Sequence, residues 1–207
     1  MFSDFLLTIP RTIPRSAPIE GYAIAPMSWT GAVFPGGDNM TFHGEVEVIL
    51  DEILKLNLNF TAPTQDYGKE GLARRDLEAR HPTRLACDGG GPNGSQGRRT
   101  GANVAWAEAQ RLRGLGGTAC GGPGRSCVRM GCTSGTEIWL CNDNDQHYDD
   151  RCDWTGYLAE LAISGCQRGV NMCNEVTCWT RWEVMGAQYD VRNYNVMITH
   201  GPDDNRC

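Results

Sequence analysis

The chain has 207 residues, of which 40% are hydrophobic and 26 are glycine, a length that suits one domain with an appendage or two small domains. Its net charge of −6 excludes the extended basic face with which nucleic-acid-binding proteins hold phosphates. No apolar run approaches the roughly 20 residues that cross a bilayer, so the sequence predicts no membrane span.

The first 71 residues contain no cysteine and include one predicted amphipathic helix, "GEVEVILDEILKLN" at residues 44–57. Acidic side chains and Lys55 occupy the polar side of this helix. The segment has nothing of its own large enough to bury the opposite side, so we expect that side to cover an apolar face of the rest of the chain. The apolar stripe consists of Val46, Ile49, Leu50, Ile53 and Leu54.

Residues 61–80 are polar, contain proline and glycine, and predict a linker. Within it, Arg74-Arg75 is the dibasic pair after which a processing protease of the kexin type cuts. Such a cut would separate a cysteine-free segment from a cysteine-dense one. We therefore interpret residues 1–75 as a pro-segment with linker and residues 76–207 as a cysteine-rich domain; the alternative is that the two arginines adjoin by chance.

Secretion is the prediction that unites these features, although the chain begins without a signal peptide. "MFSDFLLTIPRTIPRSAP" has no basic n-region, and "FLLTIP" is too short for an h-region, so we expect that the signal peptide is missing from this sequence. Three triplets match the acceptor pattern for N-glycosylation and give mild support to an extracellular location. Their acceptor residues are Asn39, Asn59 and Asn93.

The cysteines are the strongest signal for the compartment. All ten follow residue 86, a density that cytosolic proteins avoid because their thiols are kept reduced. The even count predicts five disulfides, with the pairing left open. A zinc site is the alternative, but the closest cysteines have four residues between them and no histidine at a companion spacing. The ten are Cys87, Cys120, Cys127, Cys132, Cys141, Cys152, Cys166, Cys173, Cys178 and Cys207.

Beyond the linker the pattern predicts helix, strand, strand, helix, strand, strand. The helices are "RTGANVAWAEAQRLRGLGG" and "CDWTGYLAELAISGC", and the strands are "RSCVRMGC", "GTEIWLCNDN", "WTRWEVMGAQYD" and "VRNYNVMITHG". Adjacent strands joined by short turns pair antiparallel, and both helices can cover one face. We therefore expect an α+β fold, a disulfide-rich two-layer α/β sandwich behind a pro-segment that contains one amphipathic helix.

The run "SCVRMGCTSGTEIWLCNDND…CDWTGYLAELAISGC…GAQYDVRNYNVMITHG…C" resembles small secreted cysteine-rich proteins of filamentous fungi, which carry a comparable pro-segment. More distantly, it resembles the KP4 type of killer toxin in its succession of cysteines, strands and a Cys-bracketed helix. The resemblance covers about residues 85–207 and implies a toxin or an effector. KP4-type toxins are implicated in blocking calcium channels through a cationic contact, which only arginines could supply here because no lysine follows Lys69.

Two groups of polar residues have the chemistry for a site. His147 or His200, together with Glu137 and Arg129, could run the acid–base chemistry of a ribonuclease, against the simpler interpretation that these are surface histidines. The segment "DNDQHYDD" could supply oxygen ligands to Ca²⁺, but it lacks the turn glycine and the closing glutamate of an EF-hand. We expect a solvated acidic loop, and we predict no metal or other cofactor. Its aspartates are Asp143, Asp145, Asp149 and Asp150.

Trp179 and Trp182 are the candidate residues for contact with a target, because aromatic side chains make good interface anchors. The alternative is that they cover the open face of the sheet. The leading functional hypothesis is a monomeric, non-enzymatic toxin or effector that binds an unidentified protein on another cell. A cell-surface, structural or antimicrobial protein of the producing fungus is the second hypothesis, and a small secreted ribonuclease is the third.

Overall fold

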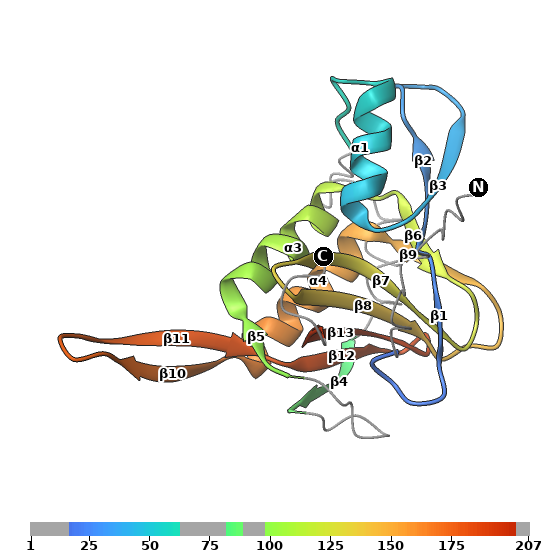
Figure 1. The fold of residues 1–207 in the computed structure, drawn as a ribbon. Coiled ribbons are helices and arrows are strands. Elements are labelled where there is room, and N and C mark those ends of the chain that lie inside the picture. The colour runs from blue at the N-terminus through green and yellow to red at the C-terminus, as the bar shows by residue number, and fades with distance from the viewer. Residues whose placement is uncertain (1–16, 63–81, 89–97, 202–207) are drawn as a thin grey trace, which may run out of the picture.

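A computed structural model of the chain describes residues 17–62, 82–88 and 98–201 (Figure 1). These residues form an α+β fold with three helices and mostly antiparallel sheets. The predicted fold class is therefore confirmed at this level. The predicted cleavage site Arg74-Arg75 and the acceptor Asn93 lie outside the described residues.

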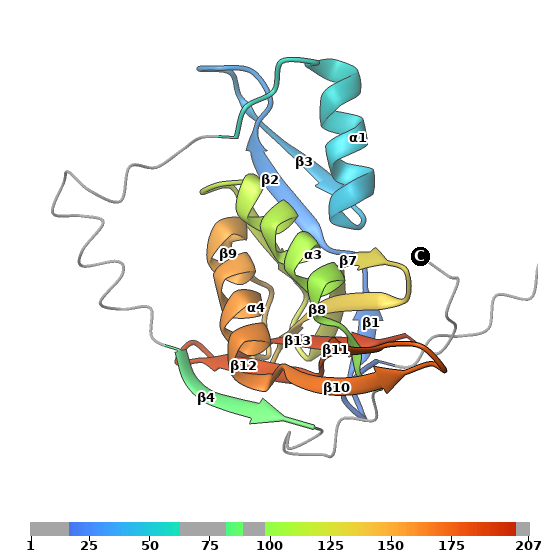
Figure 2. The same ribbon diagram turned by 90° about the vertical axis from the view of Figure 1, so that its left-hand side faces the viewer.

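The helices are α1 (Val46–Leu56), α3 (Ala102–Gly114) and α4 (Cys152–Cys166). None of them is long and apolar enough to cross a membrane. Helices α3 and α4 lie side by side (Figure 2). They approach closely at Gly156, where an added Cβ would lie 2.8 Å from the Ala109 carbonyl oxygen, so a larger residue would push the two helices apart.

The strands belong to three sheets rather than to the single antiparallel sheet expected from the sequence. One sheet has the order β1-β7-β8-β13-β12-β4, the second β3-β2-β6-β9 and the third β10-β11-β5. The strands are β1 (Ala23–Ala25), β2 (Ser28–Ala32), β3 (Asn39–His43), β4 (Pro82–Cys87), β5 (Thr100–Gly101), β6 (Ala119–Gly122), β7 (Ser126–Thr133), β8 (Thr136–Asn142), β9 (Tyr148–Arg151), β10 (Arg168–Cys173), β11 (Cys178–Val184), β12 (Gly186–Asp190) and β13 (Tyr194–His200).

The main core lies between the helices and one face of β7, β8 and β13. Side chains alternate between the two faces of a strand, and here both faces are covered. The helix side carries Val128, Met130, Ile138, Leu140, Val196 and Ile198. The opposite face has a smaller cluster in which Trp139 and Met197 pack with Ile19. The side chains of β8 and β13 therefore alternate between two buried clusters.

Residues 17–62, which we call the N-terminal lobe, are built into the cysteine-rich body. Strand β1 pairs in parallel with β7, and β2 pairs antiparallel with β6. Helix α1 buries Val46, Ile49 and Ile53 in the main core, whereas Leu54 of the predicted apolar stripe is 39% exposed. The apolar side of α1 is thus buried in a core that the lobe and the body share, and the lobe contributes strands as well as a helix.

Eight cysteines form four disulfides, Cys87–Cys166, Cys120–Cys152, Cys127–Cys141 and Cys173–Cys178. Cys132 is also disulfide-bonded, and Cys207 lies outside the described residues. The first three disulfides link β4 to the end of α4, β6 to the start of α4, and β7 to β8. The fourth closes the turn between β10 and β11. The predicted disulfide-rich character is therefore confirmed, and it is consistent with an extracellular location.

Candidate functional site

A two-stranded arm projects from the body (Figure 1). It consists of β10 and β11, which pair antiparallel from Arg168–Glu183 to Cys173–Cys178, and we call residues 168–184 the arm. All of its residues from 168 to 182 are exposed except Val170 and Met172, which are half-buried. An isolated two-stranded hairpin is only marginally stable in water. The disulfide at its far end therefore supplies order that packing does not.

The two candidate tryptophans lie on opposite faces of the arm, because they are three residues apart on one strand. Trp179 shares its face with Met172, its cross-strand partner, and it is 49% exposed. Trp182 is 53% exposed and lies opposite Gly169, where an added Cβ would be 3.8 Å from its ring. Neither residue covers the open face of the six-stranded sheet, which was the alternative interpretation from the sequence.

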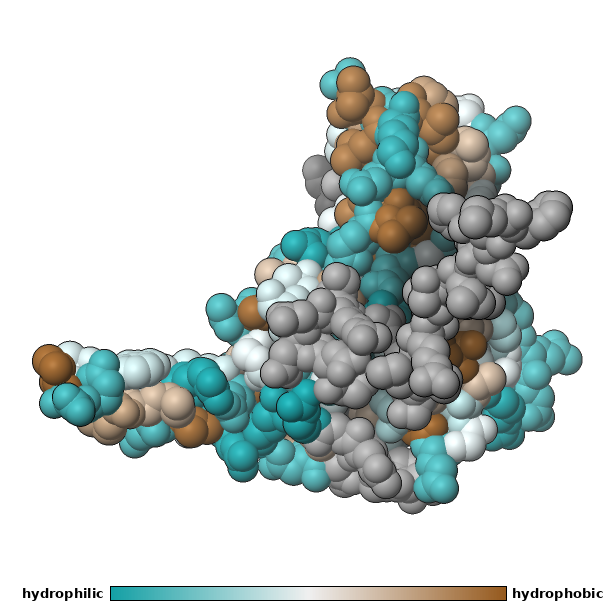
Figure 3. All heavy atoms as spheres, in the orientation of Figure 1, coloured by the Kyte–Doolittle hydropathy of each residue, from teal (hydrophilic) through white to brown (hydrophobic). Residues whose placement is uncertain are grey.

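The end of the arm carries one exposed apolar residue. Val176, in the turn between the two disulfide-linked cysteines, is 87% exposed. The turn itself is held by Asn174, whose Oδ1 accepts hydrogen bonds from the backbone N–H groups of Val176 and Thr177 at 2.9 and 2.8 Å. Figure 3 shows an apolar group at this end of the arm. A fixed, exposed turn with a projecting apolar residue is a suitable contact for a partner.

Arg99 fixes the root of the arm. Its Nη1 donates hydrogen bonds to the carbonyl oxygens of Cys166 and Glu183, at 3.2 and 3.1 Å, and its Nη2 forms an ion pair with Asp88. The hydrogen bond from Arg99 lowers the pKa of the Asp88 carboxyl below its usual range. Strand β11 also pairs with β5 at two positions and buries Val184 in the main core, so Arg99 adds to the attachment of the arm at this point.

Beside the root of the arm is an open hollow of about 300 Å³. Arg181, which lies in it, forms an ion pair with Glu183. His200 Nδ1 lies 2.7 Å from the Gly201 carbonyl oxygen and 3.4 Å from Arg98 Nη2. The hollow combines one imidazole, one carboxylate and several guanidinium groups. Among its lining residues are Arg98, Arg99, Arg181, Glu183, Thr136 and His200.

The four residues considered for ribonuclease chemistry do not form one site. Arg129 and Glu137 make a buried ion pair at 2.9 Å, and Arg129 also pairs with Glu45. His200 is paired in register with Thr136, so it points to the other face of the sheet from Glu137. His147 Nε2 lies 2.9 Å from Asp149 Oδ1, but both side chains are on an exposed segment. The Arg129–Glu137 pair is a structural contact within the sheet.

The acidic segment between β8 and α4 directs its carboxylates to separate partners. Asp143 accepts a hydrogen bond from the Tyr22 hydroxyl at 2.6 Å, and Asp145 pairs with Arg125 at 2.8 Å. Within the described residues, no group of three or more His, Cys, Asp or Glu side chains is arranged to hold a metal ion. Buried Asn142 organises the segment instead, since its Nδ2 donates to the carbonyl oxygens of Gly122, Pro123 and Gln146.

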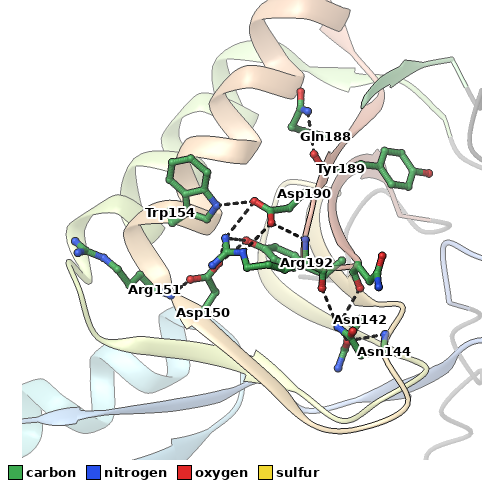
Figure 4. Close-up of polar contacts among 11 residues, drawn as sticks. Asn142, Asn144, Asp150, Arg151, Trp154, Gln188, Tyr189, Asp190 and Arg192 are labelled. Carbon is green, nitrogen blue, oxygen red and sulfur yellow. Dashed lines mark hydrogen bonds and ion pairs between the residues drawn. The ribbon is translucent and has the colours of Figure 1, made fainter. Parts of the chain in front are cut away.

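A buried polar network that sequence reasoning missed ties β9, α4, β12 and β13 together (Figure 4). Arg192 reaches both Asp150, at 2.6 Å, and Asp190, at 2.8 Å, and the two carboxylates are 2% and 0% exposed. Trp154 Nε1 donates to Asp190 Oδ2 at 3.0 Å. Burial, followed by the charges of both aspartates, raises the pKa of Tyr194, whose hydroxyl donates to Asp150. The network anchors the body.

A second polar contact joins the N-terminal lobe to α3. Glu108 is fully buried, and Arg111 Nη1 donates to its Oε1 at 2.6 Å and to Glu47 Oε1 at 3.1 Å. Both carboxyl groups pack over Gly131 of β7, where an added Cβ would lie 2.6 Å from Glu108 Oε2 and 3.5 Å from Glu47 Oε1. Burial, followed by a hydrogen bond with Glu108, raises the pKa of Glu47 to about 7.

The N-terminal lobe also exposes apolar residues and two of the candidate glycosylation sites. Asn39, on β3, and Asn59, after α1, are both exposed. Figure 3 shows apolar residues gathered over α1, β2 and β3. The large exposed apolar side chains of this lobe are Ile24, Phe34, Met40, Val48, Leu54, Leu56 and Leu58.

Comparisons of the chain with protein-family models, with curated proteins and with solved structures give no match.

Proposed function

We propose that this chain is a secreted, disulfide-rich binding protein, toxin-like or effector-like, that contacts a protein on another cell through the arm. The observation that carries the proposal is that Trp179 and Trp182 stand about half-exposed on a projecting hairpin closed by a disulfide. Tryptophan and arginine dominate the energetics of protein interfaces, and a pre-ordered element loses little entropy when it binds. The arm presents both residue types.

The body is proposed to be the two-layer α/β scaffold from which the arm projects, with α3 and α4 covering one face of the six-stranded sheet. The apolar cluster shared by these helices and by β7, β8 and β13 supports this arrangement. The N-terminal lobe is proposed to be the pro-segment, released after a cut at Arg75. The first cysteine of the chain is Cys87, so the lobe forms no disulfide. After a cut at Arg75, only non-covalent contacts would hold the lobe on the body.

The resemblance to fungal secreted proteins and to KP4-type toxins suggests fungal and plant cells as the test surfaces. Fluorescently labelled full-length protein is added to fungal and to plant protoplasts, and unlabelled protein competes for binding. We expect saturable binding to one cell type that unlabelled wild type displaces. The unlabelled double variant Trp179→Ser/Trp182→Ser should displace it at least 30-fold less well, because two interface anchors cost about 2 kcal/mol or more.

The matched control is Val191→Ser, which removes an apolar side chain of similar exposure, 45%, from the body. It should compete like wild type. Binding that only the cell-wall fraction of a fungal host retains would contradict the proposal and support the cell-surface alternative. Equal competition by wild type and the double variant would exclude the arm as the contact surface.

A second candidate function rests on the hollow at the root of the arm. His200 and Glu183 line it together with three arginines, a set that could supply acid–base groups and phosphate contacts for cleavage of RNA. Incubation with yeast RNA tests this directly. Cleavage that His200→Ala abolishes would favour the ribonuclease hypothesis, and absence of cleavage at micromolar protein would exclude it.

A further inference from the structure

Glu47 and Glu108 bring two carboxyl groups together across the boundary between the N-terminal lobe and the cysteine-rich body. Glu47 is on the first turn of α1 and its side chain is 34% exposed, whereas the side chain of Glu108 on α3 is 0% exposed. Arg111 donates to one oxygen of each. Glu108 Oε2 is buried without a hydrogen-bond partner among the contacts of the described residues.

A buried carboxylate oxygen without a donor is costly, and one arginine cannot neutralise two carboxylates. A proton shared between the two groups removes both penalties, because a protonated Glu47 donates to Glu108. Two carboxyl groups that share a site cannot both ionise at little cost, so one of them keeps its proton to a higher pH than usual. The raised pKa of Glu47 agrees with this geometry.

The charges around the pair come from three elements. On α3 the facing cation is Arg111, which also donates to Thr133 Oγ1 of β7 at 3.1 Å. On β7 the nearby Arg129 is engaged with Glu45, which directly precedes α1, and with Glu137 of β8. On α1 itself Asp51, one turn after Glu47, is exposed. Arg111 is therefore the cation that the pair shares.

We propose that Glu47 and Glu108 form an acid-stabilised joint, which holds the N-terminal lobe on the cysteine-rich body and loosens as the pH rises toward neutral. The proposal does not depend on the identity of the target or on the role of the arm. In a chain cut at Arg75, no disulfide would retain residues 17–62, because the first cysteine is Cys87. Retention or release of the lobe would then depend on contacts such as this joint.

The direction of the effect follows from proton linkage. When the lobe is detached, Glu47 has its ordinary pKa of 4.5, and when it is docked its pKa is about 7. Between these values the docked state binds more protons, so docking weakens as the pH rises. Below about 4.5 both states are protonated and above about 7 both are ionised. The whole change therefore falls inside this window.

Detachment of the N-terminal lobe exposes the α1 amides, so their hydrogen exchange in the full-length protein, normalised to intrinsic exchange rates, measures the opening constant. The difference between the two pKa values of Glu47 limits the change of the opening constant with pH to roughly 300-fold. Solvent screening lowers this limit, because the Glu47 side chain is one-third exposed. We expect the opening constant of α1 to rise on the order of tenfold or more between pH 4.5 and 7. It should then stay level up to pH 8.5.

Glu47→Gln keeps a side chain that can donate to Glu108 but cannot titrate, so its opening constant should stay within about threefold across the same range. Asp51→Asn, the matched control on the same helix, should keep the wild-type profile. A flat wild-type profile would overturn the proposal. So would a Glu47→Gln profile as steep as that of wild type, or a wild-type opening constant that rises only above pH 7.

Discussion

The disulfide at the end of the arm offers a test of whether the arm is a separate structural unit. Cys173 and Cys178 are five residues apart, so their bridge closes a ring of about six residues. The loop-closure relation assigns such a ring about 2.2 kcal/mol at 25 °C. Because residues 168–182 of the arm are exposed or half-buried, opening of the arm alone should become easier by that free energy while the body stays folded.

The double variant Cys173→Ser/Cys178→Ser should therefore raise the hydrogen-exchange rate of the β10 and β11 amides by about 40-fold. The amides of β7, β8 and α4 should become faster by no more than the same factor, because the bridge also constrains the globally unfolded chain, and the thermal midpoint should fall less than when the Cys87–Cys166 bridge is removed. The control is Cys87→Ser/Cys166→Ser, whose bridge spans 79 residues and is worth about 4.5 kcal/mol by the same relation. A loss of global stability in the arm variant as large as in the control would refute the reasoning, as would unchanged exchange in β10 and β11.

Two further predictions concern the body and the precursor. Arg192→Met leaves Asp150 and Asp190 buried without their shared cation and should lower the free energy of unfolding by about 3–5 kcal/mol in urea titrations. The control Arg125→Met breaks an exposed ion pair with Asp145 and should leave the free energy of unfolding unchanged. If both variants change the free energy of unfolding equally, the buried network does not stabilise the fold. Secretion from a fungal host behind a supplied signal peptide should give a product that starts at Asp76 with every thiol oxidised. A full-length product with free thiols, by intact mass, would contradict both processing and the disulfide framework.

The parts of the fold that could be predicted from sequence are segments with a clear periodic pattern of apolar residues or with a cysteine at each end. Helix α4 coincides with the segment between Cys152 and Cys166, and β13 carries the alternating Tyr194, Val196 and Ile198. The short strands β1, β5 and β6 carry no such signal, because they have two to four residues and depend on partners distant in sequence. Their pairing is set by tertiary contacts rather than by local propensity.

The candidate site was only partly predictable for a related reason. Trp179 and Trp182 were identified as exposed aromatic residues, but the segment 179–190 was expected to be one extended element. It is divided at Met185 between the arm and the six-stranded sheet, and this division is what places the tryptophans away from the body. The pair of Glu47 and Glu108 was missed because its members are 61 positions apart, and only the packing of α1 on α3 and β7 brings them together.

Equilibrium binding of labelled wild type and of labelled Trp179→Ser/Trp182→Ser to the same protoplasts tests the central claim most directly. Both proteins should first give the same thermal midpoint, since the two side chains lie outside the core. The account predicts that the double variant reaches half-saturation at a concentration at least 30-fold higher than wild type. Equal half-saturation of the two proteins would contradict the assignment of the arm as the surface that binds the target.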